Sequence, residues 1–134
     1  MDDSLKYSEV VLDHYRNPRN VGEIRDTEAL AQVGDPATGD VLRISLRIEG
    51  DRIADARFKA FGCTAAIAAG SMATTLLLGR SVDEARRLTN EDVVRALDGL
   101  PESKRQCSVL VEQAILEALR RHHEASLAQG APCR

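Results

Sequence analysis

The residues best suited to chemistry in this chain are its cysteines, and Cys63 occupies the most informative position. An alternating pattern typical of a strand runs into Phe61, Gly62 interrupts it, and a helix rich in small residues is predicted from Thr64. Cys63 is therefore expected beside the free N–H groups at the start of a helix, which favour a negative charge. A thiol in that setting loses its proton more easily than in water, so the pattern suits a reactive or metal-binding sulfur.

Cys107 is expected in a similar setting, at the start of the last helix. Apolar residues from Cys107 to Leu119 recur at helical spacing, with charged residues on the opposite face, so Cys107 should face the core. A lone cysteine at such a position is most often a small buried hydrophobic residue, but two cysteines in matched settings favour a function. The third cysteine, Cys133, follows Pro132 near the C-terminal end, where a thiol is most often incidental.

The composition fits one domain with a core of Leu, Ile, Val and Ala, since 43% of the 134 residues are hydrophobic and only 3% are aromatic. Few aromatic residues and a net charge of −3 argue against nucleic-acid binding. The sequence has no apolar run of membrane-spanning length and no secretion signal, so we expect a cytoplasmic protein without membrane association. In that compartment the cysteines are expected to be free thiols, metal ligands or redox groups.

Hydrophobic periodicity and turn residues predict the elements that would position these cysteines. In chain order they are a helix over 5–15 capped by Ser4 or Ser8, a short strand near 29–33, a hairpin of strands 42–48 and 54–60, a helix over 64–78 ended by Gly79, two short helices with capping boxes at Ser81 and Thr89, and a long helix from Cys107. We expect one domain over residues 1–125 and a flexible tail over 126–134.

Several other residues have ordinary structural interpretations. Asp40 follows a turn rich in Gly and Pro, and its position alone predicts a solvated turn residue. His14 is expected to cap or pack the first helix, and His122 and His123 to be solvated at the end of the last helix. Gly70, inside a predicted helix, indicates that another group approaches the backbone closely there.

Specific segments spread along the chain carry a resemblance to a known family. They are Asp13-His14-Tyr15-Arg16-Asn17-Pro18-Arg19-Asn20-Val21-Gly22, Gly39-Asp40-Val41, Asp55-Ala56-Arg57-Phe58-Lys59, Phe61-Gly62-Cys63, Ser81-Val82-Asp83-Glu84-Ala85, Leu100-Pro101 with Lys104, and Cys107-Ser108-Val109. From Tyr7 to about His123 the chain resembles the iron–sulfur cluster assembly scaffolds of the IscU type and the N-terminal domain of NifU. The resemblance implies an α+β fold, in which a small antiparallel sheet of about three strands is packed on one side by helices, with N- and C-terminal helices.

The resemblance also implies a function. Such scaffolds hold iron and sulfide as a [2Fe–2S] cluster, accept persulfide sulfur from a cysteine desulfurase, and pass the cluster to apo-proteins or carriers, in some cases with an Hsp70-type chaperone. They are carriers and not enzymes in the ordinary sense. Asp40, Cys63 and Cys107 align with an aspartate and two cysteines of the family's metal site. Cys107 also aligns with the persulfide acceptor, and Lys104 with a lysine close to the site.

Two positions depart from the family pattern. Thr38 stands where the family has its first cysteine, and Gln106 where it has a histidine beside the third. A neutral hydroxyl and an amide are poor donors to iron or zinc, so three ligands remain and one coordination position is open. The fourth donor could come from a second protomer, Cys133, a small thiol or the desulfurase, which leaves both a monomer and a homodimer open.

Three interpretations follow for this site. The first, which we predict, is an iron–sulfur scaffold with a non-standard site. The second is a degenerate paralogue that binds the desulfurase, with zinc, as a regulator or sulfur acceptor that builds no cluster. The third is an ordinary scaffold in which Thr38 is an engineered substitution. All three require that Asp40, Cys63 and Cys107 converge in space.

Overall fold

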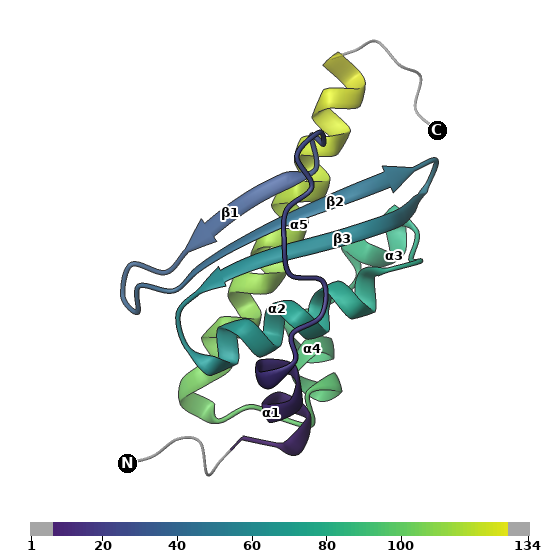
Figure 1. Ribbon diagram of the computed structural model, residues 1–134. Helices are drawn as coiled ribbons and strands as arrows, with labels where there is room; N and C mark the ends of the chain where they lie inside the picture. Colours follow the sequence, from purple (N-terminus) through teal and green to yellow (C-terminus); the bar gives the residue numbers. More distant parts are fainter. Residues whose placement is uncertain (1–6, 129–134) are drawn as a thin grey trace.

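The structure, a computed structural model, describes residues 7–128 and contains a three-stranded antiparallel sheet in the order β1-β2-β3 (Figure 1). The strands are β1 (Leu30–Gly34), β2 (Val41–Glu49) and β3 (Arg52–Phe61). The helices are α1 (Glu9–Arg16), α2 (Thr64–Leu77), α3 (Val82–Arg86), α4 (Asn90–Ala96), the 3-10 turn η2 (Glu102–Lys104) and α5 (Arg105–Ala128). The predicted α+β fold with a three-stranded sheet is confirmed.

The sheet is amphipathic, and its apolar face forms the core. Leu42, Ile44 and Leu46 of β2 are buried and alternate with the half-buried Arg43 and Arg47, as the period of two predicts. Helices α2 and α5 cover this face, and the connection between α1 and β1 crosses the opposite one (Figure 1).

That connection explains a buried polar residue on the outer face. Ser45 is only 1% exposed, and its Oγ accepts a hydrogen bond of 2.9 Å from the Ile24 N–H of the crossing segment. Backbone hydrogen bonds between this segment and Phe58 extend the contact to β3. β2 therefore buries Ser45 on its outer face as well as apolar residues on its inner face, because the crossing segment covers part of the outer face.

Gly70 shows the close approach that its position in a helix predicts. A Cβ built on Gly70 would lie 2.5 Å from the Phe58 ring, well inside van der Waals contact. Phe58 is 2% exposed, so its ring fills the space directly beneath α2. His14 is the packing residue that was expected, since it is buried and its Nδ1 lies 2.7 Å from the Ser71 Oγ of α2.

The helix ends agree with most of the predicted signals. Ser8 caps α1, and the capping boxes that begin at Ser81 and Thr89 both form. The last helix differs: α5 begins at Arg105 and not at Cys107, because the 3-10 turn after Pro101 runs directly into it. Cys107 therefore lies inside the first turn of α5.

The C-terminal end of α5 reaches Ala128, three residues beyond the domain boundary expected at residue 125. His123 is exposed as expected, whereas His122 is half-buried and burial lowers its pKa. Ser4 and Cys133 lie outside the described residues, and the division into a domain and a tail stays a prediction. Within residues 7–128, no helix combines the length and the apolar character that crossing a membrane requires.

Candidate metal centre

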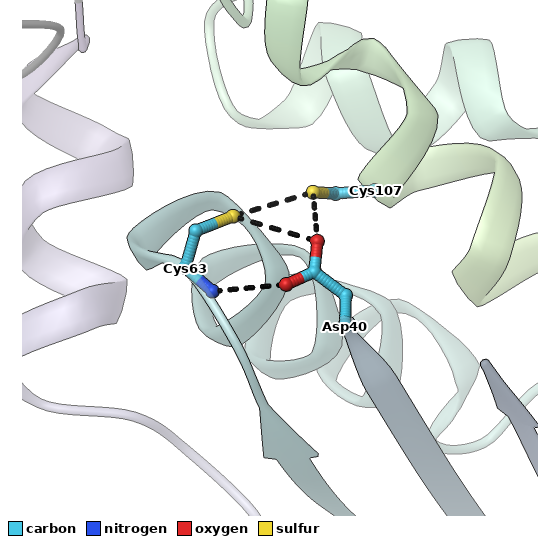
Figure 2. Close-up of side chains that lie close together, drawn as sticks. All are labelled: Asp40, Cys63 and Cys107. Atoms are coloured by element: carbon cyan, nitrogen blue, oxygen red, sulfur yellow. Dashed lines mark hydrogen bonds between the residues drawn. The ribbon is translucent and has the colours of Figure 1, made fainter. Parts of the chain in front are cut away.

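Three side chains from separate parts of the chain meet at one end of the sheet (Figure 2). Asp40 immediately precedes β2, Cys63 is the N-cap of α2, and Cys107 lies in the first turn of α5. The Cys63 and Cys107 Sγ atoms are 3.5 Å apart, and they lie 3.9 and 3.7 Å from Asp40 Oδ2. The convergence of these three residues is thus confirmed.

The loop before β2 holds Asp40 by hydrogen bonds to the backbone. The Asp35 carbonyl accepts from the Thr38 and Gly39 N–H groups, at 3.2 and 2.7 Å, and closes the turn. The Asp40 N–H donates to Thr38 Oγ1 at 3.2 Å. Asp40 is only 8% exposed, so the expectation that it is a solvated turn residue is wrong. It is buried because Val41 pairs with Phe61, which places the residue before β2 beside the residues after β3.

The carboxylate of Asp40 is oriented by the backbone of the opposite strand end. Its Oδ1 accepts a hydrogen bond of 3.3 Å from the Cys63 N–H, while Oδ2 faces the two sulfurs (Figure 2). One oxygen is therefore engaged with the protein, and the other is available as a donor.

The spacing of the three donor atoms can be compared with a tetrahedral metal site. From usual metal–ligand distances, two thiolates on one zinc ion lie about 3.8 Å apart, and a thiolate and a carboxylate oxygen about 3.5 Å apart. The observed separations of 3.5, 3.7 and 3.9 Å differ from these values by about 0.4 Å or less. Asp40, Cys63 and Cys107 can therefore form one triangular face around an ion, with the fourth vertex left for another ligand.

The two thiols have different proton affinities. A hydrogen bond from Cys107 is the main cause that lowers the pKa of Cys63 to about 6, and nearby N–H groups at the start of α2 lower it further, against the effects of burial and the negative Asp40. The pKa of Cys107 is raised, first by the hydrogen bond to Cys63 and then by burial. The lowered pKa of Cys63 and the raised pKa of Cys107 thus favour a pair that shares one proton at neutral pH. A metal ion that binds both sulfurs must release that proton.

The remaining predicted residues lie around this group without joining it. Lys104 is half-buried in η2, and no described residue forms an ion pair with it within 4.0 Å. Gln106 is exposed. Thr38 is exposed too, and its hydroxyl is engaged with the Asp40 N–H. Its correspondence to a family cysteine stays a prediction. Cys133, a suggested fourth donor, lies outside the described residues.

Comparisons with known proteins agree with this fold. The model of the NifU-like N-terminal domain matches residues 6–128. The iron-sulfur cluster assembly scaffold protein IscU 1 of Archaeoglobus fulgidus is 44% identical over 84% of this chain and 74% of its own length. IscU of Escherichia coli K12, also named a scaffold protein, is 43% identical over 86% of this chain and 92% of its own length.

A solved structure shares the fold at lower identity. The N-terminal part of a nitrogen-fixing NifU-like protein from Brucella abortus has a TM-score of 0.58 and 19% identity, over 92% of this chain and 87% of that one. The family match covers all of the described residues, and the scaffold relatives exceed 40% identity. The chain therefore belongs to the family of NifU-like N-terminal domains, which the matching IscU relatives represent.

Proposed function

We propose that this protein is an iron–sulfur cluster assembly scaffold that holds iron, or a [2Fe–2S] cluster, with Asp40, Cys63 and Cys107. The observation that carries the proposal is the convergence of one carboxylate and two sulfurs, all within 4.8 Å of one another, from three separate parts of the fold. Thiolates are the usual ligands of iron–sulfur clusters. The scaffold names of the IscU relatives support the same role. We expect the protein to work in the cytoplasm.

Sulfur would arrive as the persulfide of a cysteine desulfurase. A thiolate of this chain attacks the outer sulfur of that persulfide, a new S–S bond forms on the scaffold, and the desulfurase sulfur leaves as a thiolate. From the family resemblance we expect Cys107 to make this attack and Lys104 to lie close to the reacting group. Cys107 is only 5% exposed and its pKa is raised, whereas Cys63 is half-buried and its pKa is lowered. Sulfur transfer to Cys107 therefore requires that the side chains around it open.

The open fourth position suits delivery of the cluster. Three donors leave one vertex where a thiolate of an apo-protein or carrier, the final acceptors of the cluster, can bind before the scaffold releases it. The carboxylate of Asp40 is a harder donor than a thiolate and binds iron less firmly, which also favours release. An Hsp70-type chaperone is a further expected partner, from the family resemblance alone.

The alternative is a regulator that binds the desulfurase and one zinc ion without building a cluster. The observation that favours it is the fit of the three donors to one face of a single tetrahedral ion. In that case the protein would accept sulfur from the desulfurase or limit its transfer, and the fourth zinc ligand would come from a partner.

Anaerobic reconstitution separates the two proposals. The full chain is incubated with ferrous iron, cysteine and a cysteine desulfurase, then desalted and examined by visible absorption, Mössbauer spectroscopy, and iron, sulfide and zinc analysis. The scaffold proposal expects a [2Fe–2S] spectrum with equal iron and sulfide, which is lost in the Cys63→Ser and Cys107→Ser variants. Stoichiometric zinc and no cluster, under conditions where an IscU relative assembles one, would show that the regulator proposal is correct.

A further inference from the structure

Gly62 directly precedes Cys63, and its backbone lies against the side chain of Asp40. A Cβ built on Gly62 would fall 2.0 Å from Asp40 Oδ1 and 2.8 Å from its Cγ. Both distances are too short for any side chain, so the Asp40 carboxylate occupies the space that a side chain at position 62 would need. Of the described glycines, Gly62 is the one whose missing side chain makes room for a candidate metal ligand.

The same contact fixes the orientation of the carboxylate. With no side chain at position 62, Oδ1 reaches the Cys63 N–H at 3.3 Å, and Oδ2 is left facing both sulfurs at 3.7 and 3.9 Å (Figure 2). Because Oδ1 lies on the Cys63 N–H and Oδ2 faces both sulfurs, Oδ2 is the oxygen placed to bind an ion together with them. The orientation thus depends on the empty space at Gly62 as well as on the loop that carries Asp40.

We propose that Gly62 is a positioning residue for metal binding, which makes Asp40 a donor through Oδ2 alone by letting Oδ1 reach the Cys63 N–H. The inference rests on the proposed function, since it assumes that Asp40 is a ligand. It adds a residue that offers no ligand atom of its own, and it specifies which oxygen of Asp40 binds.

Gly62 also has a backbone conformation that favours glycine, and this effect must be separated from the steric one. Its φ is +151°, and Gly22, beside β3, has a similar φ of +142°. A Cβ on Gly22 meets nothing closer than a carbon of the flexible Arg57 side chain at 3.9 Å. The Gly22→Ala variant therefore carries a similar backbone strain without the collision, and it is the matched control.

The Gly62→Ala substitution should reproduce the loss of Asp40. The new methyl group forces the carboxylate away, which breaks the hydrogen bond to the Cys63 N–H and moves Oδ2 out of the donor triangle. The two sulfurs remain, so binding should weaken and not vanish. Groups that orient a metal ligand typically contribute about 10–100-fold to affinity, and we expect a loss in that range.

The test is an anaerobic titration of the reduced full chain with Co²⁺, whose visible spectrum reports the number of sulfur and oxygen donors. Gly62→Ala and Asp40→Ala should each weaken Co²⁺ binding by about 10–100-fold and give the same altered d–d bands. The double variant should bind no more weakly than either single variant, because both remove one interaction. Gly22→Ala should bind as the parent does.

A second measurement needs no metal. In the metal-free parent, the amide proton of Cys63 should resonate downfield because it donates to a carboxylate, and this shift should be lost in Gly62→Ala and in Asp40→Ala. The Asp40→Ala comparison keeps this test decisive even if Gly62→Ala does not fold. An unchanged Cys63 amide in Asp40→Ala would overturn the orientation that we propose.

The outcomes also separate this inference from the proposed function. If the parent binds no Co²⁺ while the amide shift behaves as expected, the metal-binding role fails, and so does the part of the inference that concerns a ligand. If the parent binds Co²⁺ and Gly62→Ala binds it equally well with the same spectrum, the positioning role is wrong and the proposed function stands. Additive losses in the double variant would likewise contradict a shared interaction.

Discussion

Two glycines of this protein, one in the core and one at the candidate metal centre, each leave space that a neighbouring side chain occupies. At Gly70, the missing side chain admits the Phe58 ring beneath α2. At Gly62, the missing side chain admits the Asp40 carboxylate beside two sulfurs. The first contact excludes water from an apolar core, whereas the second orders a polar group that has little apolar surface to bury. Loss of the first should therefore affect the free energy of unfolding, and loss of the second should affect metal binding.

Packing of the core and binding of a metal ion should therefore respond to different substitutions in this fold. The core beneath α2 consists mainly of Ala, Leu, Ile and Phe side chains that are almost fully buried. The site lies where two strand ends and the first turn of α5 meet, and its Cys63 is only half-buried. Substitutions at the two places can test whether metal binding and the free energy of unfolding change independently.

The largest effect is expected from removing one of the two sulfurs. Cys63→Ser and Cys107→Ser each leave a hydroxyl, a far weaker donor, so stable binding of zinc or of a cluster should be lost altogether. The midpoint of thermal unfolding without metal should change little in Cys63→Ser, because the half-buried serine keeps the size of the residue. Metal analysis after desalting, together with thermal unfolding, checks both expectations. Metal retained at the parent's level in either variant would contradict the proposed ligand set.

The same two variants decide which sulfur accepts the persulfide. Labelling with a desulfurase and cysteine, followed by mass spectrometry, should show one added sulfur on the parent and none on Cys107→Ser if Cys107 is the acceptor. Labelling that is kept in Cys107→Ser and lost in Cys63→Ser would instead assign the role to the more accessible thiolate.

A smaller effect is expected in the core from Gly70→Ala. The added methyl group would lie 2.5 Å from the Phe58 ring, so the ring or α2 must shift. Overpacking of this kind typically costs about 1–3 kcal/mol of the free energy of unfolding, partly offset by the better helix propensity of Ala, about 0.5–1 kcal/mol. Urea denaturation measures this loss, while Co²⁺ affinity should stay within about twofold of the parent. A large loss of metal binding here would show that core and site are not separable.

Most helices and strands could be predicted from the sequence because they depend on local signals. Alternation predicted the β2–β3 hairpin, and side-chain caps predicted the starts of α1, α3 and α4. Even the close contact at Gly70 was predicted, since a glycine in a helix costs stability unless something needs the space.

The burial of Asp40 could not be predicted in the same way, because it depends on the register of the hairpin. Near the turn, Ile48 pairs with Ile53, but after a bulge Arg47 pairs with Asp55. This one-residue shift is what pairs Val41 with Phe61 at the far end and so places Asp40 next to Gly62. A bulge has no strong signal in a single sequence, so only the family resemblance pointed to Asp40. The start of α5 was misplaced for a related reason, because a 3-10 turn continues into the helix.

A still smaller effect, on metal affinity, is expected from Thr38→Cys, which tests the open coordination position. Thr38 lies on the loop that carries Asp40, two residues away, and a thiolate there could complete the donor set if the loop lets it turn toward the sulfurs. We expect metal to be held at least about tenfold more tightly, the lower end of what one supporting group contributes at a metal site. Thr38→Ser keeps the hydroxyl that accepts from the Asp40 N–H and should bind as the parent does. Competition with a metal-binding dye measures the change, and equal affinity of Thr38→Cys and Thr38→Ser would place the open position elsewhere.

The smallest effect is a shift along the pH axis in the metal-free protein. Because the pKa of Cys63 is lowered to about 6, its alkylation by iodoacetamide should rise with pH through about 6, whereas an unfolded cysteine reacts with a midpoint of about 8.5. The lowered pKa of Cys63 favours folding increasingly from about pH 6 up to about pH 8.5, and this contribution is lost as the pH falls through about 6, whereas the raised pKa of Cys107 opposes folding above about pH 8.5. Cys107→Ala removes the hydrogen bond that is the main cause, and the midpoint for Cys63 should move upward. Gly70→Ala, which changes the core alone, should leave the midpoint where it is. A midpoint that shifts equally in both variants would mean that the reactivity of Cys63 reflects packing under α2 and not its contact with Cys107.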